Sequence, residues 1–305
     1  MKTIRGIAKN SSKAWKVCQF LLLMVAFTFI AMALWAVVLP NSQDISSMKV
    51  LQMLQTIATF LFPSFCCAYL WSNNPFKWLK LDVTPTWKMT LLAIILIIVL
   101  LPGINLLSYL NQQIALPTFL SQLESLMQQQ EEAATELTEQ FIKADSVGVL
   151  FYNLFLMAFL PAISEEVCFR GILLRLFTPD KYLSNSKFSQ NTSKANSSTP
   201  HIAIWVCAIL FSAIHFQFYG FIPRMLLGAL FGYLVVWSGS LWLPVIAHFT
   251  NNAIAVLSYN WFYMQTKDPD IINDLGTGHT LWLGISSLVI GGVLFYLFCH
   301  ISNNK

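Results

Sequence analysis

Residues 89–110, MTLLAIILIIVLLPGINLLSYL, form an apolar run without a charged side chain. A helix needs about 20 apolar residues to cross the hydrocarbon core of a bilayer, so this run is long enough to span a membrane. Seven further apolar runs flank it, and each is expected to be helical because a bilayer offers no water to satisfy the backbone. The predicted spans are 17–39, 48–71, 89–110, 147–164 with a helical continuation to about 177, 201–219, 223–237, 241–263 and 280–300.

The composition of the whole chain agrees with these spans. Among 305 residues, 56% are apolar and only 10% are charged, whereas an ordinary soluble domain carries about 25% charged residues. The net charge of +4 is too small for binding to the phosphate backbone of a nucleic acid, which excludes a nucleic-acid partner. We therefore predict an all-α, polytopic membrane helix bundle of about eight transmembrane helices, surrounded by membrane lipids.

Loop charges predict the orientation of the bundle. Lys and Arg residues gather before the first span, between the second and third spans, and after the fourth. Carboxylates gather in the segments 111–146 and 264–279. Because short loops rich in Lys and Arg stay cytoplasmic, both termini are predicted to be cytoplasmic.

The sequence divides into three segments. Residues 1–146 hold three spans and an extracytoplasmic segment, residues 147–263 hold the unusual polar residues, and residues 264–305 hold a loop and the last span. The Ser- and Asn-rich stretch 184–200 is predicted to be a flexible cytoplasmic loop. Within the first segment, residues 117–143 are predicted to form an amphipathic helix outside the membrane. Its apolar side chains recur at helical spacing and are Phe119, Leu120, Leu123, Leu126 and Met127.

Ionisable residues at membrane depth are costly and suggest a functional site. The first group is SEEVCFRG, residues 164–171. Glu166 stands four residues before Arg170, which is the favourable order for an acid–base pair along a helix. Glu165 points about 100° away from Glu166 and is predicted to be the freer carboxylate, suited to general acid or base catalysis. The alternative is a helix end at a wet interface, where these side chains are simply solvated.

Two further groups contain histidine. Phe211 and His215 are four residues apart in the predicted span 201–219, and His248 and Asn252 are four residues apart in the predicted span 241–263. The second pair presents two side-chain donors in one direction, which suits an oxyanion or a metal ion. Hydrogen bonding between helices is the alternative for each pair taken alone. Three polar groups on nearby spans favour a single site buried among the central helices.

At these residues the chain resembles the CAAX-type intramembrane endopeptidases, the CPBP or abortive-infection (ABI) family, whose eukaryotic members trim prenylated proteins. The family pattern is Glu-Glu-x-x-x-Arg, Phe-x-x-x-His and His-x-x-x-Asn on successive core helices. These motifs stand intact and in order at 165–170, 211–215 and 248–252. The resemblance covers about residues 147–260.

The resemblance implies an intramembrane endopeptidase. Glu165 and His215 would polarise a water molecule that attacks a peptide carbonyl. Glu166 and Arg170 would hold that site in order, and Phe211 would wall it. The implied partner is a peptide or protein substrate, with or without a lipid group, and the implied location is a bacterial cytoplasmic (inner) membrane.

By the same resemblance, His248 and Asn252 would donate hydrogen bonds to the developing oxyanion, a contribution often worth a factor of ~100–1,000 in rate. Two histidines and a glutamate are also a donor set for zinc. The His-Glu-x-x-His helix of many zinc proteases is absent from the sequence. We therefore expect a metal-independent glutamate mechanism without a cofactor, and zinc is the alternative.

Two other functions fit parts of the pattern. A non-catalytic membrane module, such as a bacteriocin self-immunity protein or a scaffold, would use the same polar residues for binding. A transporter would use buried carboxylates for proton coupling. It ranks last, because no internal repeat is visible and the first three spans are almost free of charge.

Overall fold

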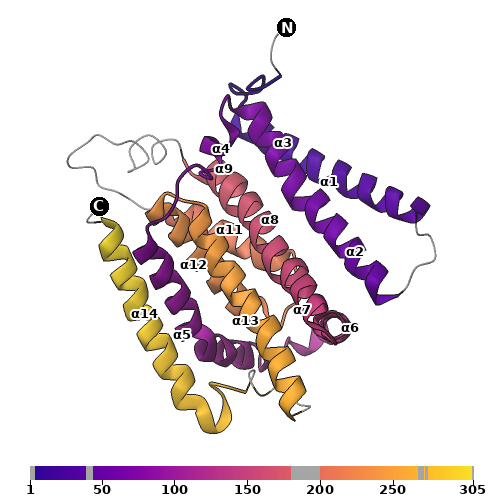
Figure 1. Cartoon of the computed structure of the whole chain (residues 1–305), viewed down its shortest axis with the longest axis vertical. Coiled ribbons are helices and arrows are strands. Elements are labelled where there is room, and N and C mark those ends of the chain that lie inside the picture. Colours follow the sequence, from indigo (N-terminus) through magenta and orange to yellow (C-terminus); the bar gives the residue numbers. More distant parts are fainter. Residues whose placement is uncertain (1–3, 39–43, 180–199, 267–270, 272–273, 304–305) are drawn as a thin grey trace. The chain divides into compact units, whose positions relative to one another are not determined.

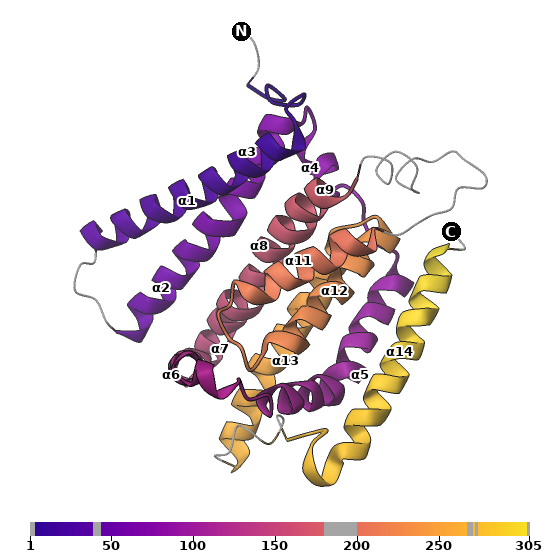
Figure 2. The same cartoon turned by 180° about the vertical axis from the view of Figure 1, so that it is seen from behind.

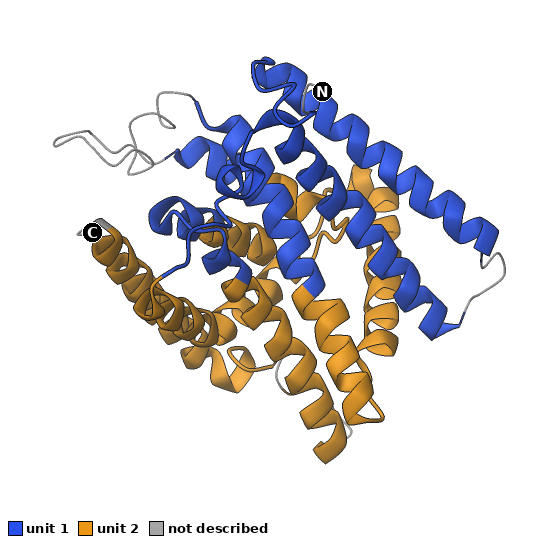
Figure 3. Ribbon diagram, turned by 45° about the horizontal axis from the view of Figure 1, so that its top comes forward, with its two compact units in different colours: residues 1–85, 160–207, 232–245 blue, residues 86–159, 208–231, 246–305 orange. Residues whose placement is uncertain are grey.

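The computed structural model describes residues 4–38, 44–179, 200–266, 271 and 274–303. All regular secondary structure in these ranges is helical, so the predicted all-α class is confirmed. The helices belong to two compact units, coloured separately in Figure 3. Unit 1 comprises Met1–Pro85, Leu160–Cys207 and Gly232–Val245, and unit 2 comprises Thr86–Phe159, Ala208–Phe231 and Ile246–Lys305.

Unit 1 begins with α1 (Lys13–Val38), which runs beside a long helical stretch formed by α2 (Ile45–Thr56), η1 (Ile57–Leu61) and α3 (Phe62–Trp71) (Figure 1). A hydrogen bond of 2.8 Å between the hydroxyls of Thr28 and Thr59 joins the two. After the short helix α4 (Pro75–Trp78), the unit continues with α8 (Leu160–Glu166), η4 (Val167–Leu173) and α9 (Leu174–Phe177). The segments η1 and η4 are π-helical.

Unit 2 is built around α5 (Trp87–Gln112) and α14 (Leu281–Asn303), which lie side by side in Figures 1 and 2. Side chains of α14 pack against α5 at Gly103, where a Cβ atom would lie 2.7 Å from Leu288 Cδ2. Ser287 locks this crossing, because its hydroxyl donates to Val99 O at 2.6 Å and accepts from Gly103 N at 2.9 Å. A larger residue at position 103 would therefore displace the side chains of Leu288 and Ser287.

Unit 2 also contains several shorter elements and the helix α6. They are η2 (Thr118–Leu120), α6 (Ser121–Ile142), α7 (Val147–Asn153), η3 (Leu154–Phe159) and η6 (Gly278–Thr280). Three helices have one part in each unit: α11 (His201–Ala213), α12 (Phe221–Ser238) and α13 (Trp242–Thr266). The predicted helix over 117–143 is confirmed as η2 and α6, and Phe119, Leu123 and Leu126 are exposed on it.

Six helical stretches of the described residues are long and apolar enough to cross a membrane. They correspond to predicted spans and include the continuous stretch Val147–Phe177, whose continuation beyond residue 164 is confirmed. Over 241–263 the helix α13 forms but is not among the six, because polar residues such as His248 and Asn252 lower its mean hydropathy. The three predicted sequence segments are not tested by these units, and residues 184–199 of the predicted loop lie outside the described residues.

The predicted helix over 201–219 is wrong over its last six residues, since α11 ends at Ala213. Backbone hydrogen bonding changes from Ile214 N to Leu210 O, four residues back, to His215 N to Ser212 O, three residues back. Phe216 then has φ 53°, the left-handed conformation that ends many helices. His215 therefore lies in a turn after the helix rather than within a span.

Candidate active site

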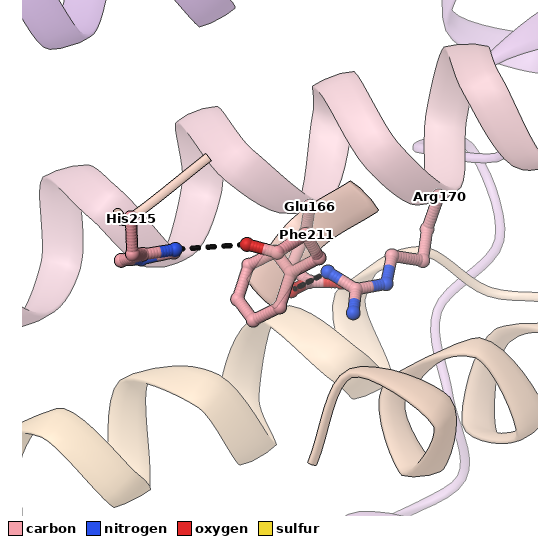
Figure 4. Close-up of polar contacts among 4 residues, drawn as sticks. All are labelled: Glu166, Arg170, Phe211 and His215. Carbon is pink, nitrogen blue, oxygen red and sulfur yellow. Dashed lines mark hydrogen bonds and ion pairs between the residues drawn. The ribbon is translucent and has the colours of Figure 1, made fainter. Parts of the chain in front are cut away.

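The acidic motif of unit 1 contains a buried ion pair. Arg170 Nη1 donates to Glu166 Oε1 at 2.7 Å, and the two side chains are 1% and 0% exposed (Figure 4). The predicted pair is therefore confirmed. Arg170 belongs to the π-helical segment η4, and π-turns inside α-helices occur frequently at functional sites.

Apolar and aromatic groups surround this ion pair. The Arg170 guanidinium carbon lies 5.9 Å from the centre of the Phe169 ring, and that ring lies 6.4 Å from the ring of Phe60. Cys168 and Cys207 are buried in the same unit. In such surroundings each charge depends on the other, because a buried charge without its partner keeps the full cost of desolvation.

Glu165 differs from its neighbour in exposure. Its side chain is half-buried, whereas Glu166 is completely buried. Successive residues of a helix point about 100° apart, which accounts for the difference. Exposure thus separates a structural carboxylate from a more accessible one, and the catalytic role of Glu165 stays a prediction.

In unit 2, His215 is held by the last turn of α11. Its Nδ1 atom lies 2.8 Å from Phe211 O (Figure 4), and its ring centre lies 5.3 Å from that of Phe211. A carbonyl oxygen can only accept a hydrogen bond, so Nδ1 carries the proton of the ring. In the neutral imidazole this leaves Nε2 as an acceptor.

His248 of α13 lies against two phenylalanines of the same unit. Its ring is stacked on Phe231, with centres 5.1 Å apart and an interplanar angle of 19°. Phe211 approaches it edge-on, at 5.9 Å and 85°. The structure therefore brings His215 and His248 together around Phe211, and their membership of one catalytic site stays a prediction. Phe231 was not predicted, because nothing distinguishes it from the other apolar residues of its helix.

Asn252 follows His248 by one helical turn on α13. Its Nδ2 atom donates to Met157 O at 3.4 Å, which is longer than the usual 2.7–3.2 Å for such bonds. Its Oδ1 atom accepts from Asn251 Nδ2 at 3.1 Å. The predicted donor thus contacts the backbone of η3 in this structure, and its part in catalysis stays a prediction.

Zinc ligation by histidines and a glutamate is the alternative to a metal-independent mechanism. The described residues contain no group of three or more His, Cys, Asp or Glu side chains arranged to hold a metal ion. We derive no step through a metal ion. Metal independence itself stays a prediction.

Comparison with known proteins agrees with the motifs. Residues 147–254 match the family described as type II CAAX prenyl endopeptidase Rce1-like. Over 122 residues the chain is 26% identical to an uncharacterised protein of Bacillus subtilis (strain 168), YpbD, and the alignment covers 39% of this chain and 51% of the relative. The chain thus spans about half the length of that relative. No solved structure matches the chain.

The family match extends over all seven predicted site residues, which lie between 165 and 252. The resemblance to CAAX-type endopeptidases is therefore confirmed for this part of the chain. Together with the apolar helices, it identifies an integral membrane protein with an Rce1-like region. The match gives no support to the alternative of a self-immunity protein.

Proposed function

We propose, from the Rce1-like character of residues 147–254, that the chain is an intramembrane endopeptidase that hydrolyses a peptide bond near the membrane surface. The observation that carries this proposal is the family match, which contains every predicted site residue. The pairing of residues into one mechanism is taken from the family resemblance. The local geometry of each group then suggests what it contributes.

Glu165 and His215 activate the attacking water in this proposal. The Phe211 carbonyl fixes the Nδ1 proton of His215, which supports a role for Nε2 as acceptor of a hydrogen bond from the water. The carboxylate of Glu165 takes the proton that the water releases as its oxygen bonds to the substrate carbonyl carbon. That proton then passes to the leaving amine, so that the carboxylate is regenerated. Such positioned acid–base catalysis contributes about 10²–10⁴-fold to a rate.

Glu166 and Arg170 support the site without touching the reacting atoms. Their 2.7 Å ion pair is buried within one helical stretch. A charge pair in apolar surroundings resists rearrangement, because separating it leaves uncompensated charges. The pair thereby fixes the backbone that bears Glu165.

His248 and Asn252 provide the donors for the oxyanion in this proposal. For Asn252, the side-chain amide would exchange its bond to Met157 O for a bond to the substrate. That bond is long, at 3.4 Å, so little is lost when it breaks. The negative oxygen of the intermediate is a stronger acceptor than a neutral carbonyl, which favours the exchange at the transition state.

A bacterial cytoplasmic membrane with both termini in the cytoplasm is the proposed setting. Lys13 at the start of α1 donates to Thr178 O after α9 at 2.6 Å, which brings two basic segments to the same end of unit 1. Arg175 lies nearby along the helix, where its guanidinium carbon is 4.5 Å from the centre of the Trp78 ring. Positive charge at this end favours a cytoplasmic orientation.

The test is cleavage of a farnesylated peptide with a C-terminal CAAX sequence by the purified protein in liposomes. We expect cleavage by the wild type and by the control Glu136→Gln, which changes an exposed carboxylate of α6. The variants Glu165→Gln and His215→Ala should each lose about 10³-fold in rate. Normal cleavage by both variants would refute the proposal. The same peptide without the farnesyl group tests whether the substrate must be lipidated.

A further inference from the structure

The turn that carries His215, residues 214–220, is tied down from several elements of unit 2. Ser212 Oγ donates to Phe221 O at 2.7 Å, and Arg224 Nη2 donates to Gln217 Oε1 at 2.7 Å. Tyr219 N makes a longer contact of 3.4 Å to Glu131 Oε2. A further pair of hydrogen bonds comes from Asn111, near the end of α5. Asn111 lies outside the part of the chain that matches the Rce1-like family.

Asn111 uses both ends of its side-chain amide on this turn. Nδ2 donates to Phe218 O at 2.9 Å, and Oδ1 accepts from Ile222 N at 2.8 Å. The side chain is only 2% exposed. In an α-helix a carbonyl accepts directly from the N–H four residues later. Phe218 O and Ile222 N have this spacing, and the Asn111 amide lies between them and bonds to both. It thereby satisfies a donor at the start of α12 that the helix itself leaves unpaired.

The same helix, α12, contacts the surroundings of both histidines further along its length. Gly228 of α12 packs against α11, because a Cβ atom there would lie 3.1 Å from Phe211 Cδ1. Phe211 O holds Nδ1 of His215. One turn further along α12, Phe231 is stacked on His248. A displacement at the start of this helix would therefore disturb the surroundings of both rings.

We propose that Asn111 is a positioning residue for the histidine half of the site: its amide fixes the turn 214–220 and the start of α12. This inference rests on the proposed function, which makes His215 and His248 part of the reaction. Asn111 does not touch the reacting atoms. It acts through the backbone between Phe218 and Ile222.

The experiment compares Asn111→Ala with the wild type in nanodiscs. Hydrogen–deuterium exchange is measured for residues 212–222, and kcat and KM are measured with the farnesylated CAAX peptide. The control is Asn105→Ala, since Asn105 is also on α5 and its Nδ2 donates to Leu275 O at 3.0 Å. We expect about tenfold faster exchange in 212–222, because Ile222 N loses its acceptor and Phe218 O keeps only the hydrogen bond from Phe221 N. We also expect about a tenfold lower kcat with little change in KM. The control should show neither change.

A second variant guards against loss of folding. Asn111→Asp has nearly the same shape; when its carboxylate is ionised it keeps an acceptor for Ile222 N but has no donor for Phe218 O. Exchange should therefore rise between residues 214 and 220, while the amide of Ile222 stays protected. Rising exchange with a falling kcat in these variants supports the proposal. Unchanged exchange in both, or faster exchange with an unchanged kcat, overturns it. Normal cleavage by both Glu165→Gln and His215→Ala would refute the proposed function instead, and would leave the exchange results unaffected.

Discussion

The carboxylate motif on α8 and η4 and the histidine region of unit 2 are held in place in different ways. Glu166 and Arg170 are four residues apart and close their 2.7 Å contact within one helical stretch. His215 and His248 instead depend on α5, α11 and α12 for their packing and hydrogen bonds. The first region is therefore specified locally, whereas the second requires that distant parts of the chain are already packed.

The two regions also differ in how easily their side chains can change partners. Removing either member of the ion pair leaves a buried charge, so that region has no low-cost alternative arrangement. Asn252 by contrast makes a long 3.4 Å bond to Met157 O. We infer that the carboxylate region is a fixed support and that the Asn252 side chain adjusts to the substrate.

The largest expected effect tests whether both regions serve one reaction. Glu165→Gln and His215→Ala should each lower kcat/KM for the farnesylated peptide by about 10³-fold. The double variant should be no slower than the worse single variant, because residues that act as a unit are strongly non-additive. A double variant that loses the product of both factors would show that the two regions act independently.

The next prediction concerns the fixed support. Arg170→Met should lower the free energy of unfolding by about 3–5 kcal/mol, because Glu166 would keep a buried charge without its partner. The double variant Glu166→Gln/Arg170→Met should recover most of that loss. Reversible unfolding in mixed micelles measures both. A loss below about 1 kcal/mol for the single variant would mean that the pair is not buried in the membrane-embedded protein.

A smaller effect is expected from the oxyanion donors. His248→Ala should lower kcat by about 100-fold with a smaller change in KM, because its donor acts on charge that develops in the transition state. Asn252→Ala should behave in the same way. Ser258→Ala is the matched control on the same helix, because its hydroxyl donates within α13 to Ile254 O at 2.6 Å, and we expect it to stay near the wild-type rate. Equal losses at Ser258 and Asn252 would contradict the assignment of Asn252.

The smallest effect concerns the packing of His248. Phe231→Leu removes the stacked ring, an interaction worth about 0.5–1.5 kcal/mol. We expect a fall in kcat of about three- to tenfold and a folded protein. Phe29→Leu, on an exposed part of α1, is the control and should have no effect. An unchanged rate for Phe231→Leu would mean that the ring is not needed to orient His248.

The same contrast explains what could be predicted from the sequence. Spacing alone predicted the Glu166–Arg170 pair, because both residues lie in one helical stretch. Long apolar runs predicted most of the spans for the same local reason. The end of α11 at Ala213 was missed, since the apolar run continues past it while the backbone turns at His215 and Phe216.

Tertiary contacts could not be predicted in this way. Phe231 lies within an apolar helix that offers many similar side chains, and only the packing of α12 and α13 selects it as the partner of His248. Asn111 lies far from the turn 214–220 in sequence and outside every motif. A polar residue near the end of an apolar helix carries no sign of its partner until the fold is known.

The most direct test of the proposed function compares new peptide termini in membranes from cells that express the wild type or Glu165→Ala at matched protein levels. Comparable folding of the variant is checked by its yield and by its elution as a single peak in size-exclusion chromatography in mild detergent. We predict a set of termini that is present with the wild type and lost with the variant, and these termini would also identify the substrate. Identical terminus profiles would contradict an intramembrane endopeptidase and would favour a binding role for the same polar residues.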